Sequence, residues 1–140
     1  MRMALTLSVF ILLTLLQTQN HVTDCARVTY EVIITTGNDK HDGIHAPLRV
    51  KVVGSKATLT VGRLDKRIEI TKDSRKTLKG SAESLGDIKE AIITIKGDDT
   101  IGILKIEVKQ QSKILAEFIC KCKISGGSKR GIFSKSKCDG

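Results

Sequence analysis

The stretch 28–53 contains two runs in which every second residue is apolar, separated by a polar loop. Successive side chains of a β-strand point to opposite faces, so a period of two predicts strands with one buried and one solvated face. Antiparallel sheets tolerate a solvated face, whereas parallel sheets are usually covered on both sides. The folded part of the chain is therefore expected to begin with two antiparallel strands. The alternating apolar positions are Val28, Tyr30, Val32, Ile34, Leu48, Val50 and Val52.

Further segments have strand character, and glycines separate most of them: 57–61, 68–70, 91–95, 101–108 and 114–122. Short strands with breaks at this spacing are typical of a β-sandwich or barrel. The segment 79–91 is the most helix-like, but Gly80 and Gly86 limit it to one turn around 81–85. The pattern predicts an all-β domain whose inward side chains include Tyr30, Val32, Ile34, Val50, Val52, Ile93, Ile95, Ile103 and Ile106.

The N-terminus has the composition of an export signal. The basic start Met1-Arg2-Met3 precedes a largely apolar run, 4–16, and then a polar segment. Such a run is too short to span a bilayer comfortably and matches the hydrophobic part of a signal peptide. We expect a signal peptide over 1–20, with cleavage between 17 and 24, followed by one domain over 25–140 with a basic C-terminal tail. The mature protein is expected to be secreted and extracellular, without a transmembrane segment.

Four cysteines lie in this expected mature part: Cys25, Cys120, Cys122 and Cys138. An even number in an exported chain predicts two disulfide bonds. A zinc site is disfavoured, because the Cys-x-Cys spacing is not that of a zinc knuckle and the three histidines are scattered. Cys120 and Cys122 are poorly placed to bond each other along one strand. Cys25 is therefore expected to bond one of these two, and Cys138 the other.

Three segments resemble the PLAT (lipoxygenase homology) family: YEVIITTG at 30–37, LGDIKEAIITI at 85–95 and GILKIEV at 102–108. The resemblance covers about residues 28–122 and is most like the C-terminal domain of secreted pancreatic-type lipases. It implies an antiparallel β-sandwich of about eight strands, stapled by disulfides, that docks to membranes or proteins beside a catalytic domain. It also implies a closing bond Cys122–Cys138, with Cys25 bonded to Cys120.

The chain departs from the family pattern at two points. Ile44-His45 stands where many PLAT domains have a Thr-Asp pair, and the chain has no tryptophan. The resemblance therefore implies docking in general more strongly than binding to lipid.

No catalytic motif accompanies the predicted sandwich. A serine hydrolase needs a G-x-S-x-G elbow, and the sequence has neither this frame nor a phosphate-binding glycine loop. We therefore expect a protein that is not an enzyme. Aspartates in two loops suggest calcium, because Ca²⁺ prefers clustered carboxylate oxygens. Aspartate is also an ordinary turn residue, and this simpler reading predicts no cofactor. The calcium candidates are Asp39, Asp42, Asp98 and Asp99.

The chain is basic, with a formal net charge of +9. Removing Arg2 with the signal leaves 23 basic and 15 acidic residues, a net charge of +8. A basic cluster on an exported domain attracts polyanions and anionic membranes. Nucleic acid is disfavoured, because export and the scarcity of aromatic residues leave no stacking surface. The predicted surface-binding residues are in the tail: Lys123, Lys129, Arg130, Lys135 and Lys137.

The sequence thus predicts a secreted, non-catalytic β-sandwich binding module. Its expected partner is a protein, a sulfated glycan or an anionic membrane surface, and a secreted effector or venom component would have the same features. The alternative is an accessory subunit of a separate lipase-like enzyme.

Overall fold

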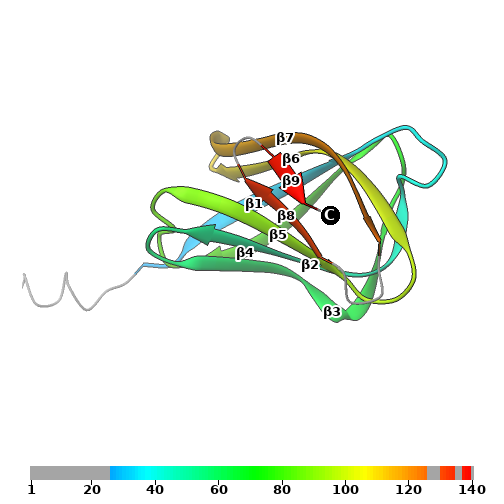
Figure 1. Cartoon of the computed structure of the whole chain (residues 1–140). Helices are drawn as coiled ribbons and strands as arrows, with labels where there is room; N and C mark the ends of the chain where they lie inside the picture. The colour runs from blue at the N-terminus through cyan, green and yellow to red at the C-terminus, as the bar shows by residue number, and fades with distance from the viewer. Residues whose placement is uncertain (1–25, 126–129, 135–136, 140) are drawn as a thin grey trace, which may run out of the picture.

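The chain folds into two facing β-sheets (Figure 1). The computed structural model describes residues 26–125, 130–134 and 137–139. These contain nine strands and no helix, so the predicted all-β sandwich is confirmed, with one strand more than expected. The strands are β1 (Val28–Thr36), β2 (Ile44–Gly54), β3 (Thr58–Ile70), β4 (Arg75–Ala82), β5 (Ile88–Ile95), β6 (Thr100–Gln110), β7 (Lys113–Ser125), β8 (Arg130–Ser134) and β9 (Lys137–Asp139).

Each sheet is antiparallel throughout. Sheet A has the strand order β4-β1-β6-β7, and sheet B has the order β3-β2-β5-β8-β9. One edge of the sandwich therefore carries β3 and β4, which contact each other, and the opposite edge carries β7 and β9. In Figure 1, β7 runs along the top of the molecule and β3 along the bottom.

The core lies between the sheets and consists of aliphatic side chains with three aromatic rings. All nine side chains predicted to point inward are buried. The Tyr30 ring is buried in the core, and its hydroxyl accepts a hydrogen bond of 3.1 Å from the Leu85 backbone N–H. This bond fixes the 83–87 loop over the end of the core, where Leu85 is itself buried.

Three parts of the fold differ from the sequence-based expectation. The segments 57–61 and 68–70, expected as separate strands, belong to the single strand β3. The segment Arg75–Ala82 forms β4, so its residues 81–82 belong to a strand rather than to a helical turn. The tail does not form a loop beyond the last strand, because 130–134 pairs with β5 as β8 and 137–139 pairs with β8 as β9. The additional strands widen the two sheets: β4 extends sheet A, and β8 and β9 extend sheet B.

A wide bulge interrupts β3. Leu48 of β2 is opposite Arg63, but the preceding residue Pro47 is opposite Arg67, so residues 64–66 have no partner in β2. Gly62, which pairs with Arg49 just before the bulge, has a φ of 77°, a conformation that glycine adopts without the strain a side chain would bring. Residues 63–67, which span the bulge, contain three cations and one carboxylate.

The antiparallel order gathers the loops at two ends. The loops 37–43, 71–74 and 96–99 lie at one end, which we call the loop end, and the turns at 55–57, 83–87 and 111–112 lie at the other. The predicted signal peptide lies outside the described residues and stays a prediction. In the part of the chain that the structure describes, no helix is long and apolar enough to cross a membrane.

Candidate functional site

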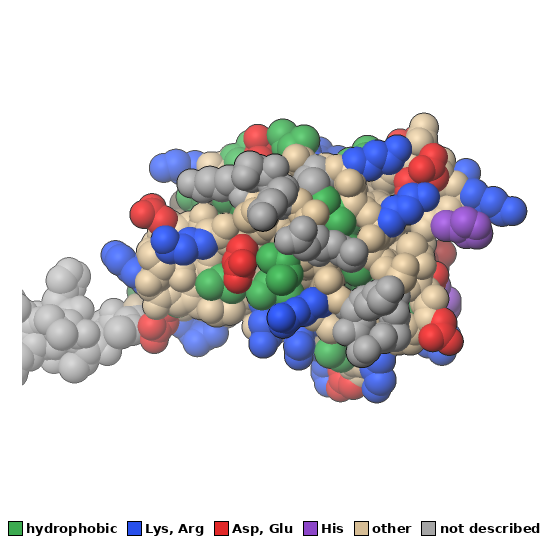
Figure 2. All heavy atoms as spheres, viewed as in Figure 1, with side chains coloured by type: hydrophobic (Ala, Val, Ile, Leu, Met, Phe, Trp, Pro, Cys, Tyr) green, Lys and Arg blue, Asp and Glu red, His purple; other side chains and the backbone are tan. Residues whose placement is uncertain are grey.

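Exposed apolar side chains gather on one hairpin. In the described ranges, every large hydrophobic residue that is exposed belongs to β6 or β7, and Ile119 is the most exposed at 71%. Phe118 is buried in the core, so its neighbours on β7 point to the outer face of sheet A. Figure 2 shows hydrophobic side chains at the top of the view, where β7 runs in Figure 1. This apolar surface consists of Leu104, Ile114, Leu115 and Ile119.

Lysines border the apolar surface. Lys105 is directly opposite Ile119 in the β6–β7 pairing, and Lys113 precedes Ile114 at the hairpin turn. Lys121 follows on the same face as Ile119 and is 72% exposed. Glu117 is also exposed, between Leu115 and Ile119 on the same strand, so the border is mainly but not wholly cationic. An apolar patch with a mainly cationic border is an arrangement suited to an anionic membrane surface or to a protein partner.

A buried glutamate organises the outer face of sheet A beside this surface. Glu107 is 3% exposed, and its Oε1 atom lies 3.1 Å from Arg75 and 3.2 Å from Lys105. Lys109 lies 4.0 Å from the other carboxylate oxygen. These cations compensate the carboxylate for the loss of water. The cluster thereby orients the Lys105 side chain beside Ile119.

The loop end holds the aspartates that the sequence singled out. Asp39 and Asp42 lie together, and Lys123 approaches both of them at 3.5 Å and 3.9 Å. Lys121 is 4.0 Å from Asp39. Lys123, a predicted surface-binding residue, is thus engaged in ion pairs within the protein.

Asp42 is buried against two glycines. Its carboxylate accepts a hydrogen bond of 3.0 Å from the Asp39 backbone N–H, and a Cβ atom at Gly37 or Gly102 would collide with it. The Gly102 backbone N–H also donates to the Asp42 carbonyl oxygen at 3.2 Å. Asp42 therefore joins the first loop to β6, which is a structural role.

Asp99 joins a second loop to β2. Its side chain accepts hydrogen bonds from the His45 N–H at 2.8 Å and from the Thr100 N–H at 2.9 Å, which is ordinary turn chemistry. Asp98 is its neighbour in the same loop. Within the described ranges, no three His, Cys, Asp or Glu side chains form a group that would hold a metal ion. The calcium hypothesis stays untested.

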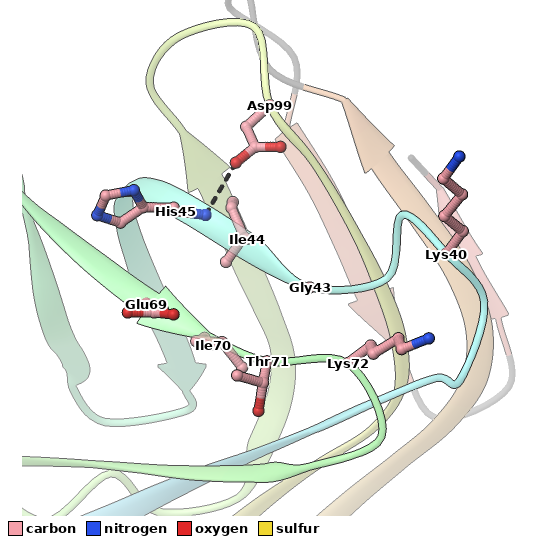
Figure 3. A pocket seen from close by; sticks show the side chains of 9 residues that line it. All are labelled: Lys40, Gly43, Ile44, His45, Glu69, Ile70, Thr71, Lys72 and Asp99. Atoms are coloured by element: carbon pink, nitrogen blue, oxygen red, sulfur yellow. Dashed lines mark hydrogen bonds between the residues drawn. The ribbon is translucent and has the colours of Figure 1, made fainter.

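A cavity of about 640 Å³ opens at the loop end between β2 and β3. Figure 3 shows Lys40 and Lys72 on one side of it, and His45 and Glu69 on the other. Cations and carboxylates are therefore mixed around this cavity. It does not have the single sign of charge that selects a charged ligand.

The structure separates the predicted basic tail. Lys123 lies on β7 in sheet A, whereas Arg130 begins β8 in sheet B, opposite Thr94 of β5. Lys129, Lys135 and the side chain of Lys137 lie outside the described residues. The tail lysines therefore remain a prediction as a binding site.

The predicted disulfides are likewise untested. Cys25 and the side chain of Cys120 lie outside the described residues. Cys122 is buried on β7, and the Cys138 sulfur lies 3.7 Å from the Lys121 carbonyl oxygen. The C-terminal cysteine is thus beside the segment that carries Cys120 and Cys122.

The chain matches no protein-family model and no curated protein sequence. Solved structures do resemble it. A lipoxygenase (LOX) deletion variant superposes with a TM-score of 0.64 at 19% identity, over 78% of this chain and 16% of that chain. The likeness lies in the fold.

Two further solved structures give the same result. Coral 8R-lipoxygenase, described as activated by calcium through a C2-like domain, has a TM-score of 0.57 at 16% identity, over 76% of this chain and 16% of that one. Clostridium perfringens alpha-toxin has a TM-score of 0.57 at 17% identity, over 76% of this chain and 32% of that one. These neighbours contain PLAT/C2-like β-sandwich domains, and this chain spans less than a third of each of them.

Proposed function

We propose that this protein is a secreted, non-catalytic module that docks on anionic membrane surfaces through the apolar surface and its lysine border. The observation that carries the proposal is the gathering of Leu104, Ile114, Leu115 and Ile119 on one hairpin. Exposed apolar side chains gain free energy when they enter the membrane interface, and each nearby lysine adds attraction to anionic lipid. Resemblance to C2-like domains of larger proteins supports the same reading.

The absence of tryptophan from the chain sets the expected depth of docking. Tryptophan and tyrosine are the side chains that anchor proteins at the membrane interface, and the single tyrosine, Tyr30, is buried in the core. Docking is therefore expected to be shallow and reversible. Salt should weaken it, because screening reduces the contribution of the lysines.

Cosedimentation with vesicles tests the proposal. We expect the mature protein to bind vesicles of phosphatidylcholine with phosphatidylserine better than vesicles of phosphatidylcholine alone. Leu115→Ser combined with Ile119→Ser should lower the partition coefficient about tenfold, since each removes an apolar side chain from the contact. Leu64→Ser, which changes a half-buried aliphatic residue in the β3 bulge at the opposite edge, is the control for the loss of one aliphatic side chain outside the apolar surface.

Equal vesicle binding by the double variant and the original protein would overturn this proposal, provided that both unfold at the same temperature. The proposal would also be overturned if the original protein showed no preference for anionic vesicles at about 50 mM salt, where screening is weak.

A second candidate is an accessory subunit that contacts a separate lipase-like enzyme through the same apolar surface. It is favoured by the small share of the lipoxygenase and alpha-toxin chains that the sandwich covers, since in them it lies beside further protein. This candidate predicts that the isolated protein does not bind vesicles. It should instead form a complex with such an enzyme in analytical ultracentrifugation, and Ile119→Ser should weaken that complex.

A further inference from the structure

A groove of about 470 Å³ lies at the edge opposite the apolar surface, between the β3 bulge and β4. Four of its lining residues are cations and none is a carboxylate. The floor is aliphatic and includes the buried side chains of Leu48 and Val61. We call this the cationic groove; its charged residues are Arg63, Lys66, Arg67 and Lys79.

Both sheets contribute to the cationic groove. Arg63, Lys66 and Arg67 come from the bulge of β3 in sheet B, whereas Lys79 comes from β4 in sheet A. In a regular strand Arg63 and Arg67 would share one face and Lys66 would point to the other, so the irregular register at the bulge is what allows all three to line the same groove. Figure 2 shows Lys and Arg side chains around β3 at the bottom of the view.

Most of this charge is available to a ligand. Asp65 binds Arg63 through two hydrogen bonds of 2.8 Å and 2.6 Å, and this contact lowers the pKa of Asp65 and raises that of Arg63. In the part of the chain that the structure describes, Lys66, Arg67 and Lys79 take part in no ion pair. Lys66 and Arg67 are therefore exposed cations of the groove without an ion-pair partner among the described residues, whereas Lys79 lines the groove from a strand position whose side chain shares the outer face of sheet A with Glu31 of β1.

The positive charge continues from the groove across the outer face of sheet B. Arg49 of β2 is opposite Gly62 on one side and Thr94 on the other, and Thr94 is opposite Arg130 of β8. Lys51 lies two residues from Arg49 on the same face. Neighbouring strands are about 4.8 Å apart, so Arg49 and Arg130 repeat at about 10 Å along this row.

A row of cations that is longer than one small anion favours a linear polyanion. The four exposed large hydrophobic residues of the described ranges all lie on β6 and β7, at the opposite edge, so this face offers a membrane no apolar contact. We propose that the cationic groove binds a sulfate group of a sulfated glycan, and that the glycan chain continues over Arg49 toward Arg130. This site is separate from the proposed membrane surface.

Dextran sulfate is the probe, with uncharged dextran as the matched polymer. Lys66→Glu combined with Arg67→Glu should raise the Kd measured by isothermal titration calorimetry at least about tenfold, because two attractive contacts become repulsive. Lys56→Glu with Lys113→Glu makes the same change of net charge at the other end of the molecule, and should alter the Kd by less than about threefold. Lys79→Gln, on the neighbouring strand, should weaken binding without altering β3.

Three results would overturn the proposal. The first is an equal loss of binding in the groove variant and the matched control, which would show attraction to net charge alone. The second is unchanged binding in both the groove variant and Lys79→Gln, with thermal unfolding confirming the fold. The third is an equal loss of binding to phosphatidylserine vesicles in the groove variant, which would assign the groove to lipid headgroups. Ile119→Ser should leave the Kd for dextran sulfate unchanged, so failure of the proposed membrane function is seen separately.

Discussion

Asp65 is the residue that limits the charge of the cationic groove. It lies outside the groove lining but holds Arg63 through a bidentate contact, and the charge of Lys96 also lowers its pKa. Both side chains are largely exposed, so the effect of the pair on folding is small. The effect of Asp65 on an anionic ligand is larger, because its carboxylate accepts hydrogen bonds that Arg63 would otherwise donate to the ligand and also repels the ligand's charge.

Asp65→Asn is therefore expected to tighten binding of dextran sulfate about two- to fivefold at neutral pH. The Arg63–Asp65 pair is present above the ordinary aspartate pKa and is lost as pH falls through the lowered pKa of Asp65. The advantage of the variant should accordingly shrink in that acidic range, because the original residue then loses its charge as well. Calorimetric titration of both proteins with dextran sulfate, once at neutral pH and once in that acidic range, checks this. A variant whose affinity at neutral pH is unchanged or weaker would contradict the role given to Asp65.

At the scale of the strand, the β3 bulge depends on one glycine. Gly62 has positive φ, and a Cβ atom there would collide with the Leu48 carbonyl oxygen. Gly97 also has positive φ, 104°, but a Cβ atom there would meet nothing within 4 Å. A substitution at Gly97 therefore reports backbone strain alone, whereas one at Gly62 reports strain together with a steric collision.

Gly62→Ala should destabilise the fold by about 2–3 kcal/mol and Gly97→Ala by about 1 kcal/mol, since only the first adds a collision to the strain of positive φ. Urea unfolding with constant m-values measures both free energies. Equal losses would show that β2 moves aside without cost. Gly62→Ala should also weaken dextran sulfate binding, because the bulge positions three of the four groove cations.

How well the sequence predicts each element depends on what the element buries. Strands β1, β2 and β6 alternate, β5 is visible as a compact apolar run over 91–95, and β7 as an apolar segment over 114–122; all five were predicted, because one face of each packs against the core. Strand β3 was predicted only as two separate segments, 57–61 and 68–70. Strand β4, RKTLKGSA, was missed, since an edge strand with Lys76 and Gly80 on its inward positions shows no apolar period. Strands β8 and β9 were missed because lysines and glycines dominate the tail.

The candidate surfaces were less predictable than the fold. Alternation places Leu115 and Ile119 on one face of a strand, but it does not predict whether that face is buried against the other sheet or exposed to solvent. The cationic groove joins residues 63–67 to Lys79, and this contact depends on a bulge and on two sheets meeting at an edge. The basic tail, in contrast, was visible in composition, but the structure divides its described residues between two sheets.

At the scale of the whole molecule, the strand register restricts the disulfides. Thr35 of β1 is opposite Lys105, which is opposite Ile119, so Cys120 lies near the end of β1 that is remote from Val28. At about 3.3 Å per residue and two strand spacings, Val28 is about 25 Å from that level. Three residues span at most about 11 Å and a disulfide joins Cα atoms within about 7 Å.

The predicted Cys25–Cys120 bond stays a prediction, because Cys25 and the Cys120 side chain lie outside the described residues; by this register it would form within one chain only if the start of β1 left sheet A. We expect peptide mapping of the unreduced protein to join Cys138 to the peptide that contains Cys120 and Cys122, since the Cys138 sulfur lies beside Lys121. Cys25 should be recovered either reduced or in a link between two chains. A Cys25–Cys120 peptide from a monomeric fraction would show that the start of β1 detaches from sheet A.

The opposite placement of β3 and β7 has a mechanical consequence. The two edges point away from each other, so under the two proposals one copy of the protein would hold a glycan on one side and a lipid surface on the other without either excluding the other. Each attachment raises the local concentration of the second partner, so two weak contacts together give a long residence time. The sandwich would then act as a rigid spacer that holds a sulfated glycan at a fixed distance from an anionic membrane.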